Sequence, residues 1–151
     1  MIAYQLCVEA QNKPGSLARI TATLAREKIN LRSITISTYQ DHGIINILVD
    51  DSKKGFKALQ KEGLPVSLKP VLAVLIDDKP GGLDELIQLL YKENINVENA
   101  YGFVLESWKN AVFVLDVDQE EKTRKILHDA GFKMLSADAL AAVEPFHYMK
   151  Y

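Results

Sequence analysis

Two short turns carry the residues of this sequence that could bind a small charged molecule. Both contain Lys-Pro-Gly after a polar residue, and they begin at Asn12 and Asp78. Each turn follows a strand-like run and precedes a helical pattern, so the first helical N–H groups lack an intrahelical partner and the helix dipole favours an anion. A ligand carboxylate fits there, and Asn12 or Asp78 could cap the turn or accept a hydrogen bond from an ammonium group. A turn that only joins a strand to a helix predicts the same pattern, so both interpretations stay open.

Other reactive side chains are scattered along the chain. The histidines, His42, His128 and His147, and the single cysteine, Cys7, lack the close spacing of metal ligands. A Gly-rich phosphate loop, a nucleophile elbow and a paired histidine and acid are also missing. We therefore expect no metal, no cofactor and no catalysis.

The two turns belong to an internal repeat with an offset of 66 residues. Between residues 12 and 31, eight of twenty positions are identical to their counterparts, including the Lys-Pro-Gly turn, Leu17 and Asn30. The same offset places residues 47–50 on residues 113–116. A repeat of this length indicates a duplicated structural unit. We expect one domain at residues 1–69 and a second at residues 70–151.

Hydrophobic periodicity predicts a strand before each turn and a helix after it. The strand-like runs are residues 3–8 and 71–76. In the second half Leu83, Leu86 and Leu90 recur at steps of three and four, which predicts one apolar helix face. We expect this apolar face to pack on a sheet.

A hairpin is expected next in each half. Residues 31–39 and 97–105 have strand patterns and are followed by turn residues. Ile34 and Ile36 alternate with polar residues, which predicts that they lie on one buried face.

A second helix and a last strand complete each half. The helices are expected to begin near Ser52 and Asp118, and Asp118 followed by Glu121 has the spacing of a capping box. The last strands are expected at residues 66–68 and 133–143. The order β-α-β-β-α-β predicts an α+β protein of two ferredoxin-like units, each with an antiparallel sheet and its helices on one face.

Only a few residues around Lys69 and Pro70 separate the halves. Because a long flexible linker is missing, we expect the two sheets to associate closely, with a cleft at their join.

Composition and charge match an ordinary globular protein. Apolar residues make up 48% of the 151 residues, and the formal charge is −2, which gives no electrostatic surplus for nucleic acid or anionic membranes. The longest apolar run, residues 71–76, is too short to span a membrane, and the N-terminus does not resemble a signal peptide. We expect a cytoplasmic protein. The aromatic residues 144–151 are expected to fold over an apolar edge or to make an oligomer contact.

The two turns and the segments after them resemble the ACT domain signature. Residues 12–17 are followed by Ile29-Asn30-Leu31, and residues 78–83 are followed by Ile95-Asn96-Val97. Residues 41–51 are also similar to those of small free-standing tandem ACT proteins. This resemblance covers essentially the whole chain. It implies a non-catalytic module that binds a free amino acid at the interface of paired ACT units. Such a module could be a free sensor or the detached regulatory partner of a metabolic enzyme regulated in trans, and it could form a homodimer.

The resemblance also implies a set of ligand-binding residues. They lie on the two turns and at the start of the second strand of each half, together with a tyrosine that could line a pocket or simply pack: Asn12, Lys13, Pro14, Gly15, Ser16, Leu17, Asn30, Leu31, Asp78, Lys79, Pro80, Gly81, Gly82, Leu83, Asn96, Val97 and Tyr101. The two asparagines, Asn30 and Asn96, match the residue that reaches a ligand held by the neighbouring unit.

The two sites need not be equivalent. Asp78 replaces Asn12, and Gly82 replaces Ser16. A carboxylate at position 78 favours an ammonium group, whereas an asparagine can donate or accept. Some members of the family also carry a histidine two residues before the turn asparagine, where this sequence has Ala10, so the identity of the amino acid stays open.

Two other classes of function share this fold. An RNA-recognition module has the same strand order and uses sheet aromatics next to a basic residue. Lys109, Phe113 and Val114 match part of that pattern, but the glycine and the other aromatics are missing and the net charge is negative. A small enzyme with an unrecognised site is the third class.

Overall fold

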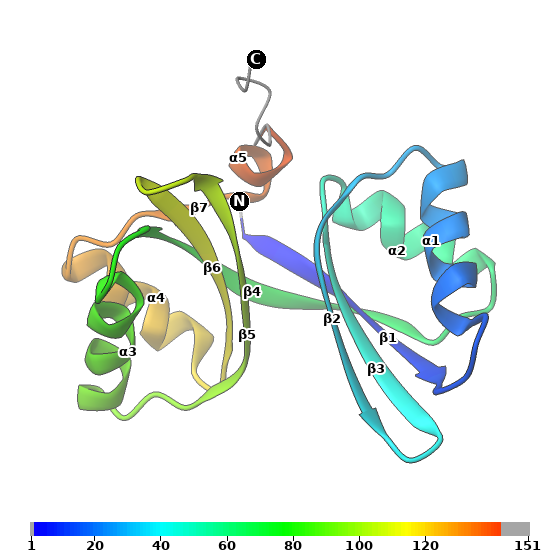
Figure 1. The fold of residues 1–151 in the computed structure, drawn as a ribbon, viewed down its shortest axis with the longest axis horizontal. Coiled ribbons are helices and arrows are strands. Elements are labelled where there is room, and N and C mark those ends of the chain that lie inside the picture. Colours follow the sequence, from blue (N-terminus) through cyan, green and yellow to red (C-terminus); the bar gives the residue numbers. More distant parts are fainter. Residues whose placement is uncertain (1, 143–151) are drawn as a thin grey trace. The chain divides into compact units, whose positions relative to one another are not determined.

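The computed structural model describes residues 2–142 (Figure 1). Its elements, in chain order, are β1 (Ala3–Gln11), α1 (Ser16–Arg26), β2 (Leu31–Tyr39), β3 (His42–Val49), α2 (Ser52–Lys61), β4 (Val66–Asp77), α3 (Gly82–Lys92), β5 (Val97–Glu106), β6 (Asn110–Val117), α4 (Glu120–Asp129), β7 (Met134–Leu135) and α5 (Ala137–Ala141). The packing expected for residues 144–151 concerns residues outside this range. None of the helices within residues 2–142 is long and apolar enough to cross a membrane.

The described chain forms two compact units. The first is Tyr4–Lys69, and the second begins at Pro70 and also includes Ala3. Strand β4 runs through the boundary, so the few residues around Lys69 and Pro70 belong to a strand. Proline lacks the N–H that a sheet ladder uses, so it is tolerated only where no ladder bond is needed. Pro70 is the first β4 residue of the second unit.

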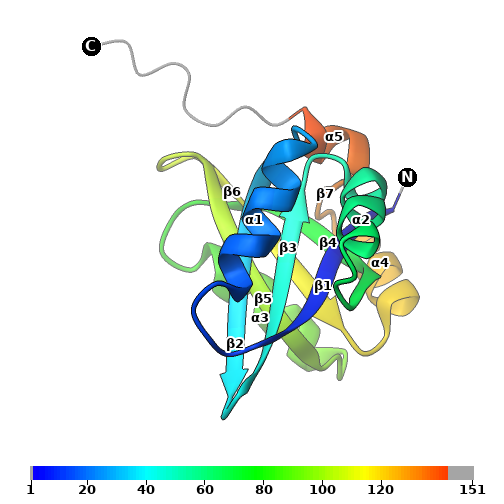
Figure 2. The ribbon, with the colours of Figure 1, turned by 90° about the vertical axis from the view of Figure 1, so that its right-hand side faces the viewer.

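Each unit has the ferredoxin-like strand order, which confirms the predicted α+β fold. The order is β2-β3-β1-β4 in the first unit and β7-β4-β6-β5 in the second, so β4 contributes to both. The pairs for which the register is known are antiparallel. In the first unit α1 and α2 lie side by side over one face of the sheet (Figure 2).

The helices close one hydrophobic core in each unit. In the first unit Ile20 and Leu24 of α1 and Leu59 of α2 pack on Leu6 and Ile47 of the sheet, and all five side chains are fully buried. In the second unit α3 and α4 cover β4 and β6 in the same way, and the predicted helix residues Leu86 and Leu90 are buried. Burying a leucine or isoleucine contributes about 1.5–3 kcal/mol, so these contacts hold each helix on its sheet.

The expected burial of Ile34 and Ile36 is wrong. Their side chains are 38% and 50% exposed. They pair with Ile47 and Ile45, so they do lie on the helix-covered face, but β2 is the edge strand and has a neighbour on one side only. The alternation of apolar and polar residues correctly identified which face of β2 turns toward the helices. It could not show that the helices leave this edge of the sheet uncovered.

The repeat changes its offset at the second hairpin. Leu6 pairs with Ile47, whereas Leu72, which lies 66 residues further along, pairs with Leu115. Ile47 therefore corresponds to Leu115, and the expected match of residues 47–50 with residues 113–116 is wrong by two residues. The β5–β6 hairpin contains the insertion, with a register shift between Val104 and Glu106 and a longer turn.

The predicted capping box at Asp118 is also wrong. Helix α4 begins two residues later, at Glu120, and its N-cap residue is Gln119. The Asp118 carboxylate instead accepts a hydrogen bond from the N–H of Asn96 at 3.2 Å. The corresponding Asp50 accepts from Asn30 N–H at 3.1 Å, so these aspartates join the start of one strand to the end of the next.

The strand expected at residues 133–143 is much shorter. Only Met134 and Leu135 form β7, and α5 follows at once. Ser136 caps this short helix by accepting a hydrogen bond from Ala139 N–H at 3.1 Å. A serine three residues before a small apolar run is an N-cap signal, and it ends the strand here.

Replacement of Lys28 by asparagine is expected to stabilise the protein by about 0.5–1 kcal/mol, because Lys28 has a φ of +57° that costs most residues about 1–2 kcal/mol. The repeat already has asparagine at the corresponding Asn94, which also has a φ of +57°. Urea unfolding of the Lys28→Asn variant tests this expectation. Asn94→Lys is the matched control and should lose a similar amount; equal stability of all three proteins would contradict the argument.

Candidate functional site

Both Lys-Pro-Gly turns place a glycine at the start of a helix. Gly15 precedes α1 with a φ of +95°, and Gly81 precedes α3 with a φ of +87°. A Cβ at either position would have free space, so only the backbone conformation requires glycine there.

The turn leaves backbone donors free at the helix start. Among the described residues, the N–H groups of Gly15, Leu17 and Ala18 have no acceptor. Those of Gly81, Leu83 and Asp84 are free in the same way. Leu17 and Leu83 are exposed, which leaves room for a ligand beside these groups. Convergent N–H groups at the positive end of a helix dipole can bind a carboxylate.

Asn12 and Asp78 do not cap these helices, and whether they accept a hydrogen bond from a ligand ammonium group stays a prediction. Asn12 Nδ2 donates to the carbonyl oxygen of Gln40 at 3.0 Å, and an Asp78 carboxylate oxygen accepts from Trp108 N–H at 2.7 Å. Gln40 and Trp108 lie at the tips of the β2–β3 and β5–β6 hairpins, and both have positive φ. Each turn is therefore held by the hairpin of its own unit, and one hydrogen-bonding function of each side chain is used internally.

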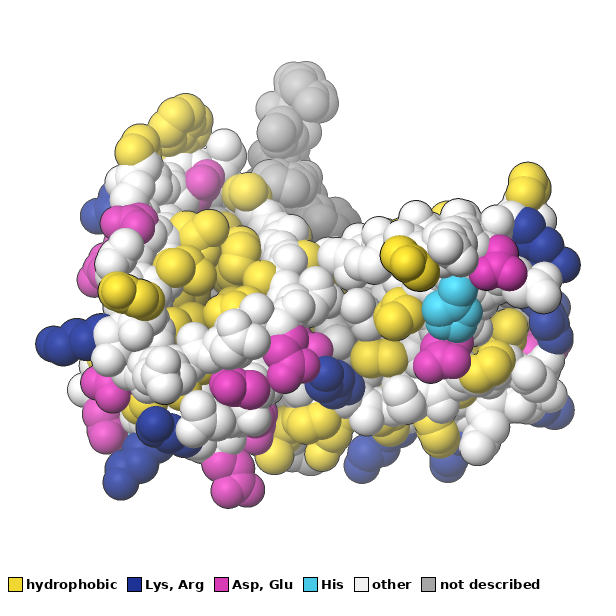
Figure 3. Space-filling model, turned by 90° about the horizontal axis from the view of Figure 1, so that it is seen from below, with side chains coloured by type: hydrophobic (Ala, Val, Ile, Leu, Met, Phe, Trp, Pro, Cys, Tyr) yellow, Lys and Arg dark blue, Asp and Glu magenta, His cyan; other side chains and the backbone are white. Residues whose placement is uncertain are grey.

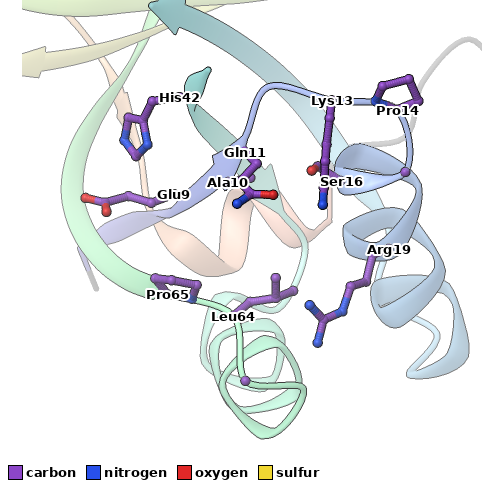
Figure 4. Close-up of a pocket in the computed structure, with 12 residues that line it drawn as sticks. Glu9, Ala10, Gln11, Lys13, Pro14, Ser16, Arg19, His42, Leu64 and Pro65 are labelled. Carbon is purple, nitrogen blue, oxygen red and sulfur yellow. The ribbon is translucent and has the colours of Figure 1, made fainter. Parts of the chain in front are cut away.

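A cavity of about 530 Å³ lies beside the first turn, within the first unit. Figure 4 shows Lys13, Ser16 and Arg19 along one wall, and Leu64 and Pro65 across from them. The remaining lining comes from β1, from the start of β3, and from the turn and the loop after α2: Glu9, Ala10, Gln11, Pro14, Gly15, His42 and Gly63. Cations and free N–H groups stand on the α1 side, so this end of the cavity suits an anion.

Arg19 is fixed at the edge of the cavity. One of its guanidinium nitrogens donates to the carbonyl oxygen of Glu62 at the end of α2. A guanidinium has five N–H donors, so others stay available to a ligand. The α1 side of the first site contains Lys13 and Arg19, and the first turn of α1 contains no acidic residue.

The helix start after the second turn is acidic, whereas the helix start after the first turn is cationic. Asp84 and Glu85 lie in the first turn of α3, and Glu85 corresponds to Arg19. The turn is also tighter, because a Cβ on Gly82 would lie 2.1 Å from the carbonyl oxygen of Asp77. In the neighbouring hairpin, a hydrogen bond from Lys109 to Glu106 raises the pKa of Lys109.

The strand residues predicted to bind ligand lie far from the turn of their own unit. Asn30 immediately precedes β2 and Leu31 begins it. The hairpin tip that holds the turn is at the other end of this nine-residue strand, about 30 Å away. Asn96 and Val97 occupy the same place in the second unit. A ligand cannot touch the asparagine and the turn of one unit together. That these asparagines reach a ligand of the neighbouring unit stays a prediction.

Tyr101 is buried in the sheet of the second unit, where it pairs with Val114 on β6. Whether it lines a ligand pocket or only packs stays open.

Sequence reasoning missed several residues that line the cavity. Arg19 follows Gly15 by four positions, so helical spacing could have placed it beside the turn. His42, Leu64 and Pro65 reach the turn only through the hairpin and the α2–β4 loop, and no local pattern indicates that. Within residues 2–142, three or more potential metal ligands do not cluster anywhere.

Known proteins share this architecture. A family model described as an ACT domain pair matches residues 1–143. The chain belongs to the ACT domain pair family. Protein BT0572 from Bacteroides thetaiotaomicron is 30% identical to this ACT pair, with a TM-score of 0.87 over 94% of this chain and 97% of that one. No curated protein sequence matches the ACT pair.

Two more distant structures share the fold of the ACT pair. The regulatory subunit of aspartate kinase from Thermus thermophilus is 17% identical, with a TM-score of 0.64 over 87% of this chain and 94% of that one. The regulatory subunit from Thermus flavus is 16% identical, with a TM-score of 0.55 over 86% and 94%. At these identities the likeness concerns the fold.

Proposed function

We propose that this ACT pair is a non-catalytic regulatory protein that binds a free amino acid through its Lys-Pro-Gly turns. The observation that carries the proposal is the cavity beside the first turn, which is lined by Gly15, with its unpaired N–H group, and by the cationic Lys13 and Arg19. The unpaired N–H groups of Leu17 and Ala18 follow Gly15 in the first turn of α1. These groups match the carboxylate that every free amino acid has. Regulation of an enzyme in trans, assembly as a homodimer and a role as a sensor follow from the family membership as parts of the same proposal.

The expected affinity is that of a metabolite sensor. A charge-assisted hydrogen bond contributes about 1.5–3 kcal/mol, and two or three of them must offset the immobilisation of the ligand. Dissociation constants from about 1 µM to 1 mM follow, which correspond to roughly −8 to −4 kcal/mol.

RNA recognition is disfavoured by the placement of Phe113. This ring packs against the helix-covered core of the second unit and lies over Gly102, where an added Cβ would meet it at 2.9 Å. A base-stacking aromatic must lie on the open face of the sheet. Acidic and basic side chains are also interspersed on the face shown in Figure 3, which does not offer a continuous basic surface.

A thermal-shift screen against the twenty amino acids is expected to find a selective ligand. At about 100 times its dissociation constant, a ligand adds about 2.7 kcal/mol to the stability, which raises the Tm of a chain of this size by several degrees. Nucleotides and a short RNA serve as controls and should leave the Tm unchanged.

Isothermal titration with the selected amino acid then gives the affinity and the number of sites. A shift with RNA alone, falling steeply with salt, would replace the proposal by nucleic-acid binding. If no amino acid raises the Tm, and titration with amino acids also detects no binding, the turns have a purely structural role.

A further inference from the structure

The second unit contains another cavity, and none of its lining residues belongs to either Lys-Pro-Gly turn. It has a volume of about 760 Å³ and lies between α4 and the segment that contains β7. Its helix wall consists of Glu121, Arg124, Lys125 and His128, which are spaced to share one face of α4.

The floor of this cavity is apolar and partly exposed. Leu75, Phe132, Met134 and Leu135 line it, and each of the four is only half-buried. Strand β7 has just two residues, so little of the sheet edge is covered there. A ligand with a small apolar group would remove this surface from water.

The walls are cationic in a chain that is slightly acidic overall. Arg124, Lys125 and Lys133 line the cavity together with the carboxylate of Glu121, so three cationic side chains and one acidic side chain belong to the lining. Arg124 is half-buried and ion-paired with Glu120, which orients its guanidinium along the helix while other N–H donors remain. Ser136 adds a hydroxyl at the far end, beside the start of α5. A guanidinium fork with two ammonium groups is the donor set that phosphate oxygens require.

The first unit shows what the duplicated position is like without the arginine. Helix α2 corresponds to α4 with an offset of 68 residues, which places Phe56 at the position of Arg124. Phe56 packs against the core of the first unit. In the second unit an arginine occupies this position and a cavity lies beside it, so the two copies have diverged at the residues that line it.

We propose that this cavity, which we call the α4 pocket, binds a small phosphate monoester with an apolar group. The phosphate contacts Arg124, Lys125 and Lys133, and the apolar group lies on Phe132 and Met134. The α4 pocket shares no lining residue with the turn of its own unit.

Titration of the full chain with phenyl phosphate tests the proposal, because this probe joins a phosphate dianion to one ring. We expect saturable binding at one site, about tenfold weaker binding of inorganic phosphate, and no binding of benzyl alcohol. The Arg124→Gln/Lys125→Gln double variant should bind phenyl phosphate at least about tenfold more weakly.

The duplicated helix provides a matched control. The Lys53→Gln/Lys57→Gln variant removes two positive charges from the corresponding face of α2, and its affinity for phenyl phosphate should change by less than about twofold. Equal weakening by both double variants would mean nonspecific attraction and would overturn the proposal. Absence of saturable binding up to about 10 mM would overturn it as well. The Tm of each variant without ligand shows that it is folded.

Discussion

Replacement of Gly82 by alanine is expected to destabilise the second unit by about 3 kcal/mol, because an added Cβ meets a closer contact here than at any other glycine of this protein. The added Cβ would lie 2.1 Å from the carbonyl oxygen of Asp77 and 3.2 Å from its carbonyl carbon. Both atoms belong to the backbone at the end of β4, so no side-chain rotation relieves the contact. The turn must open, and the hydrogen bond from Gly82 N–H to the carbonyl of Lys79 is then lost.

Urea unfolding with fluorescence detection measures this loss. The only tryptophan, Trp108, lies on the hairpin that binds Asp78 and therefore reports on the second turn. Ser16→Ala is the matched control, because it leaves the same alanine at the corresponding position of α1, where a Cβ is already accommodated. The control should lose less than about 1 kcal/mol. A loss below 1 kcal/mol for Gly82→Ala would show that the turn can open freely.

The sequence predicted the fold because its signals are local and occur twice. The Lys-Pro-Gly turns and the helix stripes each depend on a few neighbouring residues, and both copies agree. The errors arise where one copy departs from the other. The two-residue insertion in the β5–β6 hairpin changed the offset of the repeat, and Ser136 ended the last strand after two residues.

The candidate site was predicted less completely, because part of it is assembled by tertiary contacts. Spacing located the turn residues, but Leu64 and Pro65 reach the first cavity only through the packing of α2 beside α1. The use of Asn12 and Asp78 to hold the hairpins was also beyond a local pattern, since their partners are 28 and 30 residues away in the sequence. The burial of Ile34 depends on how far the helices extend over β2, and the residues of β2 alone do not predict this.

The reversal of charge between the two turns leads to the second large effect. Arg19→Glu is expected to weaken binding of the amino acid found in the screen by about 10- to 100-fold, because one charge-assisted hydrogen bond is worth about 1.5–3 kcal/mol and the new carboxylate repels that of the ligand. Lys13 and the free N–H groups remain in the variant, so residual binding is expected. Isothermal titration measures the change.

Glu85→Arg is the control that separates a local role of Arg19 from a general effect of charge. It alters the corresponding position of α3 by the same amount in the opposite direction. If only the first turn accepts a carboxylate in the natural protein, Glu85→Arg leaves the affinity at the first site unchanged. Any second site that this variant creates is weaker, because the acidic Asp78 and Asp84 remain beside it. Equal affinity of the natural protein and Arg19→Glu would place the ligand elsewhere, and the tight, acidic turn at Gly82 would then be the remaining candidate, for the ammonium end of the ligand.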